Sequence, residues 1–198
     1  MSTPGSFTHQ FLNFLLVTNG LSPEDVSTVS VGMSASSVSA LEHGKVDAAV
    51  LISSAISAFK ERHPSSAFIA DTSTVDGVRE AFGADTFPSL GLAAQDSWLR
   101  GNAETARRLV RALKRGVRWV RDHPAEEVRG MIPEGARMTE AADLQSIRRI
   151  QRGLSTDGQM PPGSPELIQK FLAISDAKVR AAHIEAANVY SNEFASAK

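Results

Sequence analysis

The chain has 198 residues, of which 42% are hydrophobic, so it can bury a substantial core in one domain or two small lobes. Its 21 basic and 22 acidic side chains leave a formal charge of −1, which provides no overall attraction to nucleic acid or anionic lipid. The sequence has no cysteine, which excludes disulfides, thiolate metal sites and cysteine nucleophiles. It also has no apolar run of membrane-spanning length, and the chain as given shows no export signal before Ser2.

The N-terminal half predicts short strands that alternate with helices. Apolar residues at helical spacing predict a first helix over about 7–18. Alternating or continuous apolar runs then predict strands, and three further helices begin after them near Gly32, Ser53 and Val75. Such alternation is typical of a parallel sheet with right-handed crossovers, so the sequence predicts an α/β fold. The four predicted strands cover residues 26–31, 47–52, 67–70 and 89–94.

The C-terminal half, beyond Asp96, predicts helices without strands. Helices are expected at about 102–122 and 139–153, another begins at residue 164, and residues 155–163 form a loop by composition. Each of these helices begins with a residue type that favours helix N-termini, namely Asn102, Thr139 and Ser164.

Three turns rich in Ser, Thr and Gly each precede a predicted helix, at residues 5–9, 32–37 and 53–54. The first amides of a helix have no intrahelical partner and lie at the positive end of the helix dipole, so such a turn can hold a sulfonate, carboxylate or phosphate. In open α/β sheets, ligands bind where such turns meet. The alternative is that each serine only caps its own helix, and neither common phosphate-loop motif is present.

The sequence gives little support for nucleic-acid binding, enzyme activity or a metal or cofactor site. Seven basic residues between 107 and 121 face an apolar stripe, which indicates an amphipathic helix with a solvated face and not a nucleic-acid site. No G-x-S-x-G motif occurs, so we expect no catalytic residues and no enzyme activity. We also expect no metal and no cofactor, because the five histidines are scattered along the chain: His9, His43, His63, His123 and His183.

The order of several segments resembles the nitrate/sulfonate/taurine substrate-binding proteins of ABC importers, the NMT1/THI5-like family, which includes thiamine-precursor binders. The matching pieces run along nearly the whole chain in the same order, and each piece alone is only moderately specific. They are residues 3–9, 20–26, 40–50, 70–72, 98–99, 102–109, 157–162 and 190–194.

This resemblance implies a type II periplasmic-binding-protein-like fold, in which two α/β lobes close on a ligand. Residues 1–86 would then be the second lobe, a parallel sheet lobe, and residues 87–198 the mostly helical C-terminal part of an incomplete first lobe. The chain would thus be N-terminally truncated, and the strand at 89–94 would have an unpaired edge and an exposed apolar surface. The resemblance assigns ligand binding to Ser6, Thr8, His9, Gly32, Met33, Ser34, Ala35, Ser53 and Ser54.

The function implied is capture of a small anionic or sulfonated solute, or of a thiamine pyrimidine precursor, in the periplasm. The partners would be that solute and the membrane subunits of an ABC permease, with no nucleic acid. Ser53 and Ser54 depart from the pattern, because many relatives have a proline there. Two alternatives stay open: an effector-binding sensor module of a transcription regulator, and a non-functional fragment of a binding protein.

Overall fold

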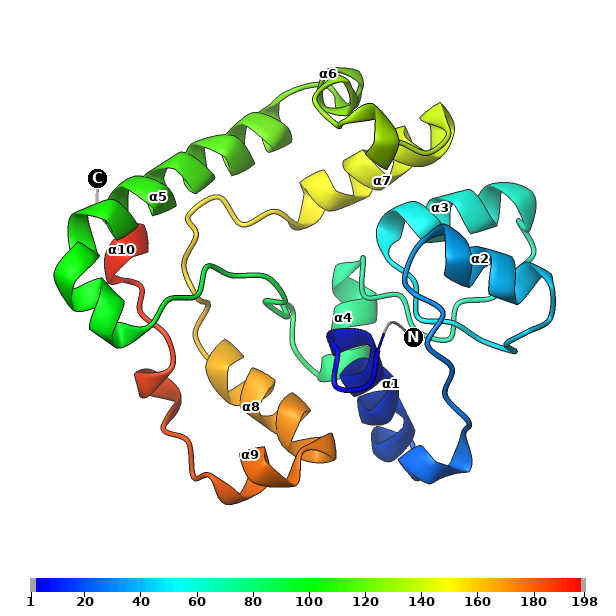
Figure 1. Ribbon diagram of the computed structural model, residues 1–198, viewed down its shortest axis with the longest axis horizontal. Coiled ribbons are helices and arrows are strands. Elements are labelled where there is room, and N and C mark those ends of the chain that lie inside the picture. The colour runs from blue at the N-terminus through cyan, green and yellow to red at the C-terminus, as the bar shows by residue number, and fades with distance from the viewer. Residues whose placement is uncertain (1–2, 197–198) are drawn as a thin grey trace.

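The computed structural model describes residues 3–196, and the regular elements in that range are all helical (Figure 1). The α-helices are α1 (Phe7–Thr18), α2 (Ala35–Glu42), α3 (Ser53–Arg62), α4 (Val75–Phe82), α5 (Asp96–Asp122), α6 (Ala125–Gly130), α7 (Glu140–Gly153), α8 (Ser164–Ser175), α9 (Ala177–Ala181) and α10 (Glu193–Ser196). Three short 3-10 helices complete the set: η1 (Pro23–Asp25), η2 (Glu134–Ala136) and η3 (Ala186–Asn188).

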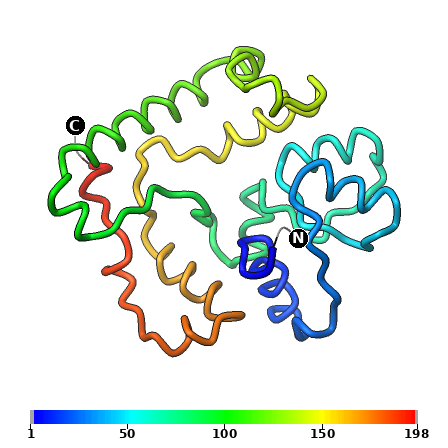
Figure 2. Tube along the Cα trace, viewed as in Figure 1, coloured from blue at the N-terminus to red at the C-terminus, as the bar shows by residue number. Residues whose placement is uncertain are grey.

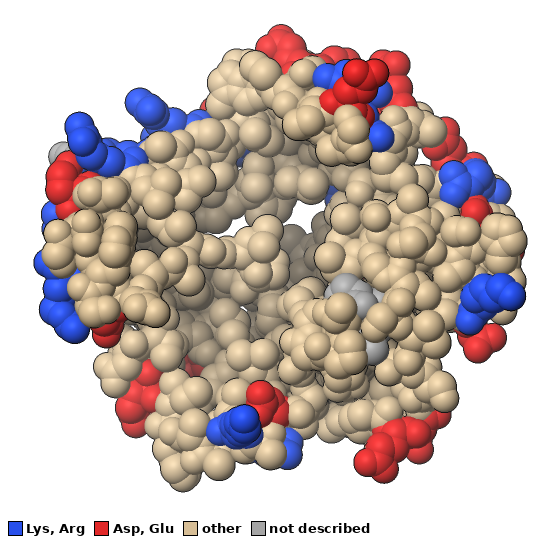
Figure 3. Space-filling model, viewed as in Figure 1, with Lys and Arg blue, Asp and Glu red and all other residues tan. Residues whose placement is uncertain are grey.

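The helices are arranged around an opening. In Figure 1, α5, α6 and α7 form one side of the molecule, α8 and α9 the opposite side, and α1 to α4 gather at one end. Figure 2 shows the chain between α4 and α5 crossing the molecule to reach the start of α5. The space-filling view in Figure 3 shows a hollow in the middle, bordered mainly by uncharged residues, whereas the coloured Lys, Arg, Asp and Glu side chains lie around the outside.

The predicted parallel sheet lobe is wrong, because the structure has no β-strand between residues 3 and 196. A strand exists only when a neighbouring segment completes its hydrogen-bond ladder. The segments predicted as strands do lie between helices, but they form no ladder within the described range. One weak backbone bond, from Ile52 N to Met33 O at 3.5 Å, joins the end of the predicted strand at 47–52 to the turn that follows the one at 26–31.

Several apolar side chains of these segments face solvent. Leu90 is 96% exposed, Leu92 53% and Ile69 85%. The exposed apolar surface expected at 89–94 is therefore present, although the segment is not a strand. The division of the chain into lobes at residue 86 stays a prediction.

The helix predictions agree well with the structure because their starts have local physical causes. The Ser6 side chain accepts a bond from His9 N at the start of α1, and Thr139 accepts one from Ala142 N at the start of α7. The long helix begins earlier than predicted, at Asp96. Asn102 lies inside it with non-helical angles (φ −132°, ψ 27°), so the predicted cap is observed as a kink.

The main core is a cluster of phenylalanines from distant parts of the chain. Phe14 of α1, Phe82 of α4 and Phe171 of α8 are each at most 8% exposed. Their ring centroids lie 5.3 Å apart for the Phe14–Phe82 and Phe14–Phe171 pairs, and 5.8 Å apart for Phe82–Phe171. Phe87, from the segment after α4, stacks on Phe82 at 4.0 Å. This cluster joins α1, α4 and α8 across the sequence.

Helix α3 packs on α7 and contains one buried hydroxyl without a hydrogen-bond partner among the described residues. Ser57 of α3 is 1% exposed, and its Oγ has no hydrogen-bond partner among the described residues. A buried hydroxyl without a partner costs about 1–3 kcal/mol. We therefore expect Ser57→Ala to raise the free energy of unfolding by about 1 kcal/mol in urea denaturation.

A matched control for this prediction is Ser37→Ala on α2. Ser37 is also fully buried, but its Oγ donates a bond of 3.1 Å to Ser34 O. Its replacement is expected to lower the free energy of unfolding by about 0.5–1.5 kcal/mol. Equal destabilisation by the two substitutions would contradict the prediction.

Candidate functional site

The second and third predicted turns lie together, at the starts of α2 and α3. The bond from Ile52 N to Met33 O joins the residues that precede the two helices. At the other end of the pair, the Glu42 carboxylate accepts bonds from Arg62 Nε at 2.7 Å and His63 Nε2 at 3.1 Å. These bonds, that of Arg62 above all, lower the pKa of Glu42. The two helices are thus tied at both ends, and both begin on the side that faces the middle of the molecule (Figure 1).

Neither of these two helix starts is capped by a side chain. Ser34 is the N-cap residue of α2 but makes no side-chain capping bond, and Ile52, which precedes α3, has no side-chain acceptor. The first-turn amides of α2 and α3 are therefore left without a side-chain cap, as an anion site requires. Met33, Ser34 and Ala35 are exposed, while Ser53 and Ser54 are half-buried.

Gly32 is needed for the shape of the second turn. Its φ is +82°, in the left-handed region that favours glycine, and a Cβ at this position would lie 2.6 Å from Ser36 Oγ. That hydroxyl in turn donates a 2.5 Å bond to Val31 O. The serines of this turn thus shape the backbone before α2 and leave the first amides of α2 without a cap.

The first predicted turn is arranged differently, because its described bonds cap α1. Ser6 Oγ donates to Thr3 O at 2.6 Å and lies 3.1 Å from Thr8 Oγ1. His9 Nδ1 accepts from Gly5 N at 2.9 Å, so this histidine orders the turn through its own ring. Thr8 is buried, at 3% exposed. The bonds described for Ser6 and His9 stay within the turn and α1. None of these bonds joins the first turn to the other two.

The phenylalanine cluster packs against the segments that precede α3 and α4 and against α1 itself. Val50, which precedes the third turn, packs against the cluster, and so does Ala70, which precedes the turn before α4. Phe11 and Phe14 place α1 on the same cluster. One core therefore fixes the start of α3, the start of α4 and the body of α1.

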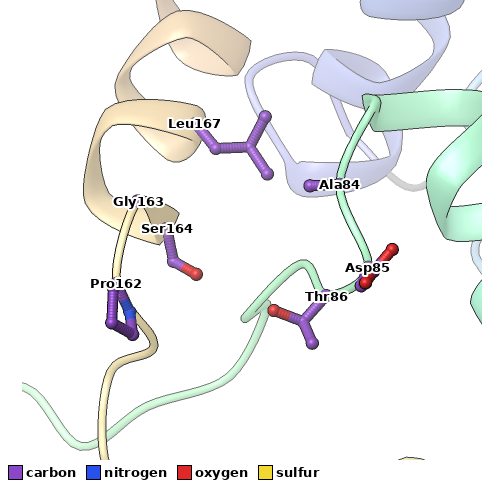
Figure 4. A pocket seen from close by; sticks show the side chains of 7 residues that line it. All are labelled: Ala84, Asp85, Thr86, Pro162, Gly163, Ser164 and Leu167. Carbon is purple, nitrogen blue, oxygen red and sulfur yellow. The ribbon is translucent and has the colours of Figure 1, made fainter.

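A shallow cavity of about 250 Å³ lies between the chain after α4 and the start of α8 (Figure 4). Figure 4 shows the Ser164 hydroxyl pointing into it from one wall and Thr86 standing opposite. Asp85 is held by Arg79, whose Nη2 is 2.8 Å from the carboxylate, and this pairing raises the pKa of Arg79. The residues that line the cavity are Ala84, Asp85, Thr86, Pro162, Gly163, Ser164 and Leu167.

Comparison with known proteins places this arrangement in a family. The model of the family described as NMT1/THI5 like matches residues 1–127. The chain belongs to the NMT1/THI5-like family. A solved protein structure from Bordetella bronchiseptica RB50 is similar to this member, with a TM-score of 0.87 and 31% sequence identity over 98% of the chain. This NMT1/THI5-like chain spans 60% of the length of that protein. No curated protein matches it.

Sequence reasoning missed a polar cluster beside α4 of this NMT1/THI5-like protein. Arg149 of α7 donates a 3.0 Å bond to Ser73 Oγ and lies 3.7 Å from Asp71 Oδ1. Ser73 also donates to the same Asp71 oxygen at 2.5 Å. Arg149 is only 17% exposed, so it is a cation held near the interior. Residues 70–72 were matched to the family by resemblance, but nothing in the sequence indicated that an arginine about 80 residues away would join them.

No helix within residues 3–196 is long and apolar enough to cross a membrane. In the same part of the chain, the His, Asp and Glu side chains form no group of three that could hold a metal ion.

Proposed function

We propose that this protein captures a small anionic or sulfonated solute of the nitrate, sulfonate and taurine class, reversibly and without covalent chemistry. The proposal depends on one observation above all, the pair of uncapped helix starts at Gly32–Ala35 and Ser53–Ser54. Membership of the NMT1/THI5-like family supports the same class of function. A thiamine pyrimidine precursor, which the family also suggests, is the other ligand class to be tested.

Backbone amides and serine hydroxyls would supply the affinity for the solute. Hydrogen bonds to a charged group contribute about 1.5–3 kcal/mol each, and the dipoles of α2 and α3 add to them. Arg149, on the helix α7 that packs on α3, is paired with Asp71 and Ser73 and is not counted among the solute's ligands. The solute would then pass to the membrane subunits of an ABC permease, and capture would take place in the periplasm.

Isothermal titration calorimetry against taurine, an alkanesulfonate, nitrate and a thiamine pyrimidine precursor tests the proposal. We expect binding of at least one anion, and weaker binding by the Ser53→Pro variant. Proline is tolerated at the first position of a helix, and Ile52 already has the extended angles that precede proline (φ −85°, ψ 163°). The substitution therefore removes one amide donor and keeps α3.

Ser53→Ala is the matched control because it removes only the hydroxyl. If the Ser53 amide contacts the ligand, Ser53→Pro should weaken binding about tenfold more than Ser53→Ala, as expected for one charge-assisted hydrogen bond. Equal affinities in the two variants would place the anion elsewhere. Failure of every tested ligand to bind the folded protein would refute capture of these solutes.

A further inference from the structure

A buried serine hydroxyl that the proposed function does not use lies at the start of α8. Ser164 is the first residue of this helix and is only 4% exposed. Within residues 3–196 its Oγ has no hydrogen-bond partner, and Figure 4 shows the hydroxyl pointing into the cavity between residues 84–86 and 162–167. Because buried polar groups are paired as a rule, this hydroxyl indicates that the cavity receives a molecule with which it can bond.

The way in which α8 begins leaves this hydroxyl available. At the starts of α1 and α7, Ser6 and Thr139 use their side-chain oxygens to accept a bond from a backbone amide of the first turn. The N-cap residue of α8 is Gly163, which has a left-handed φ of +78°, and no side chain caps this helix. Ser164 comes one position later, so its oxygen is not used in a cap and can bond a ligand.

Thr86 provides a second hydroxyl on the opposite wall of the cavity (Figure 4). Its Oγ1 also has no hydrogen-bond partner in the described part of the chain. The next residue, Phe87, stacks on Phe82 at 4.0 Å and lies 5.1 Å from Phe171 of α8. Both walls are therefore anchored to the same phenylalanine cluster, which holds the two hydroxyls in place before a ligand binds.

The charges around the cavity favour an uncharged ligand. None of the described residues that line it is a lysine or arginine, whereas Asp85 lines it and Glu166 lies in the first turn of α8. An anion would therefore meet two carboxylates and no cation in the wall. A cation gains little, because Arg79 Nη2 lies 2.8 Å from Asp85 Oδ1 and compensates its charge. The start of α8 is also the positive end of the helix dipole, which disfavours a cation.

We propose that this cavity binds a small neutral polyol through the hydroxyls of Ser164 and Thr86. A hydroxyl both donates and accepts, so a ligand with two neighbouring hydroxyls can bond both side chains. Its carbon atoms would pack against Leu167 and Ala84, which also line the cavity. The volume of about 250 Å³ is the space of roughly eight water molecules, which suits glycerol or a four-carbon polyol. This site is separate from the starts of α2 and α3 and does not depend on the proposed function.

An NMR titration of the ¹⁵N-labelled chain with erythritol, and separately with glycerol, tests the site. We expect saturable shifts of the backbone amides of Thr86, Ser164 and Leu167. Acetate and methylammonium, the charged probes, should not produce these shifts at the same concentration. The Ser53→Pro variant, which alters the start of α3, should bind erythritol as the unaltered chain does, so this result is distinguishable from failure of the proposed anion site.

Two variants and a matched control identify the hydroxyls that bind. Ser164→Ala and Thr86→Val should each raise the Kd for erythritol about fivefold, the effect of losing one hydrogen bond between uncharged groups. Ser89→Ala, at an exposed position of the same segment as Thr86, should leave the Kd unchanged. If Ser164→Ala does not fold, Thr86→Val, also at an exposed position, carries the test. The proposal is overturned by the absence of saturable shifts with both polyols, by tighter binding of a charged probe, or by an equal loss in the Ser89 control.

Discussion

Replacement of Phe171 by alanine is expected to lower the free energy of unfolding by about 3–5 kcal/mol, the usual cost of truncating a buried phenylalanine. Phe171 is 2% exposed, and its ring lies 5.3 Å from that of Phe14 and 5.1 Å from that of Phe87. Because α8 packs on α1 through this ring, truncation leaves a cavity and removes the main apolar contact between the two helices. Urea denaturation followed by circular dichroism measures the loss.

Phe68→Ala is the matched control for this large effect. Phe68 is 44% exposed, and its described ring contact is with the Lys60 ammonium, 5.0 Å from the ring centre. Its truncation should cost no more than about 1 kcal/mol. Phe171→Leu, which keeps most of the apolar volume, should cost clearly less than Phe171→Ala. If Phe171→Ala is as mild as the Phe68 variant, the phenylalanine cluster is not the main core.

The second large effect is expected at the ion pair between α6 and α7. Arg129 Nε lies 3.0 Å from Asp143 Oδ2, and the Asp143 side chain is 5% exposed whereas that of Arg129 is 23% exposed. Met138 N also donates to both Asp143 oxygens, at 3.1 and 3.2 Å. Arg129→Met should lower the free energy of unfolding by about 3 kcal/mol, because it leaves a buried carboxylate without its cation.

Substitution of the acidic partner, Asp143→Asn, gives a comparison for Arg129→Met. Asp143→Asn keeps an acceptor for Met138 N, and the Arg129 guanidinium that it leaves is the more exposed partner and can reach water. We therefore expect Asp143→Asn to cost less than Arg129→Met in the same denaturation experiment. A larger cost for Asp143→Asn would contradict the expectation that the unpaired buried carboxylate is the costlier of the two charges.

The helices could be predicted from the sequence because their causes are local. Ser6 and Thr139 cap the helices that they precede, and Gly83, with a φ of +71°, ends α4. The strands could not be predicted in the same way, because an apolar run such as 47–52 forms a strand only if another segment pairs with it. Within residues 3–196 that pairing does not occur, so the α/β prediction fails while the helix predictions hold.

The candidate site could be predicted only in part, for a similar reason. The starts of α2 and α3 could be predicted from short stretches of sequence, but their missing side-chain caps and the contact between the two helices could not. The position of Arg149 beside Ser73, and that of Asn192 beside Met160, depends on how distant helices pack. No local sequence pattern records such contacts.

The phenylalanine cluster also has a consequence for folding during synthesis on the ribosome. Phe171 follows Phe14 by about 160 residues in the chain. At a synthesis rate of roughly 5–20 residues per second, roughly 10–30 seconds pass between the synthesis of α1 and that of the Phe171 ring that packs on it. During that interval only the rings of Phe82 and Phe87 can pack on α1, so part of its apolar face stays exposed to a chaperone that binds apolar segments.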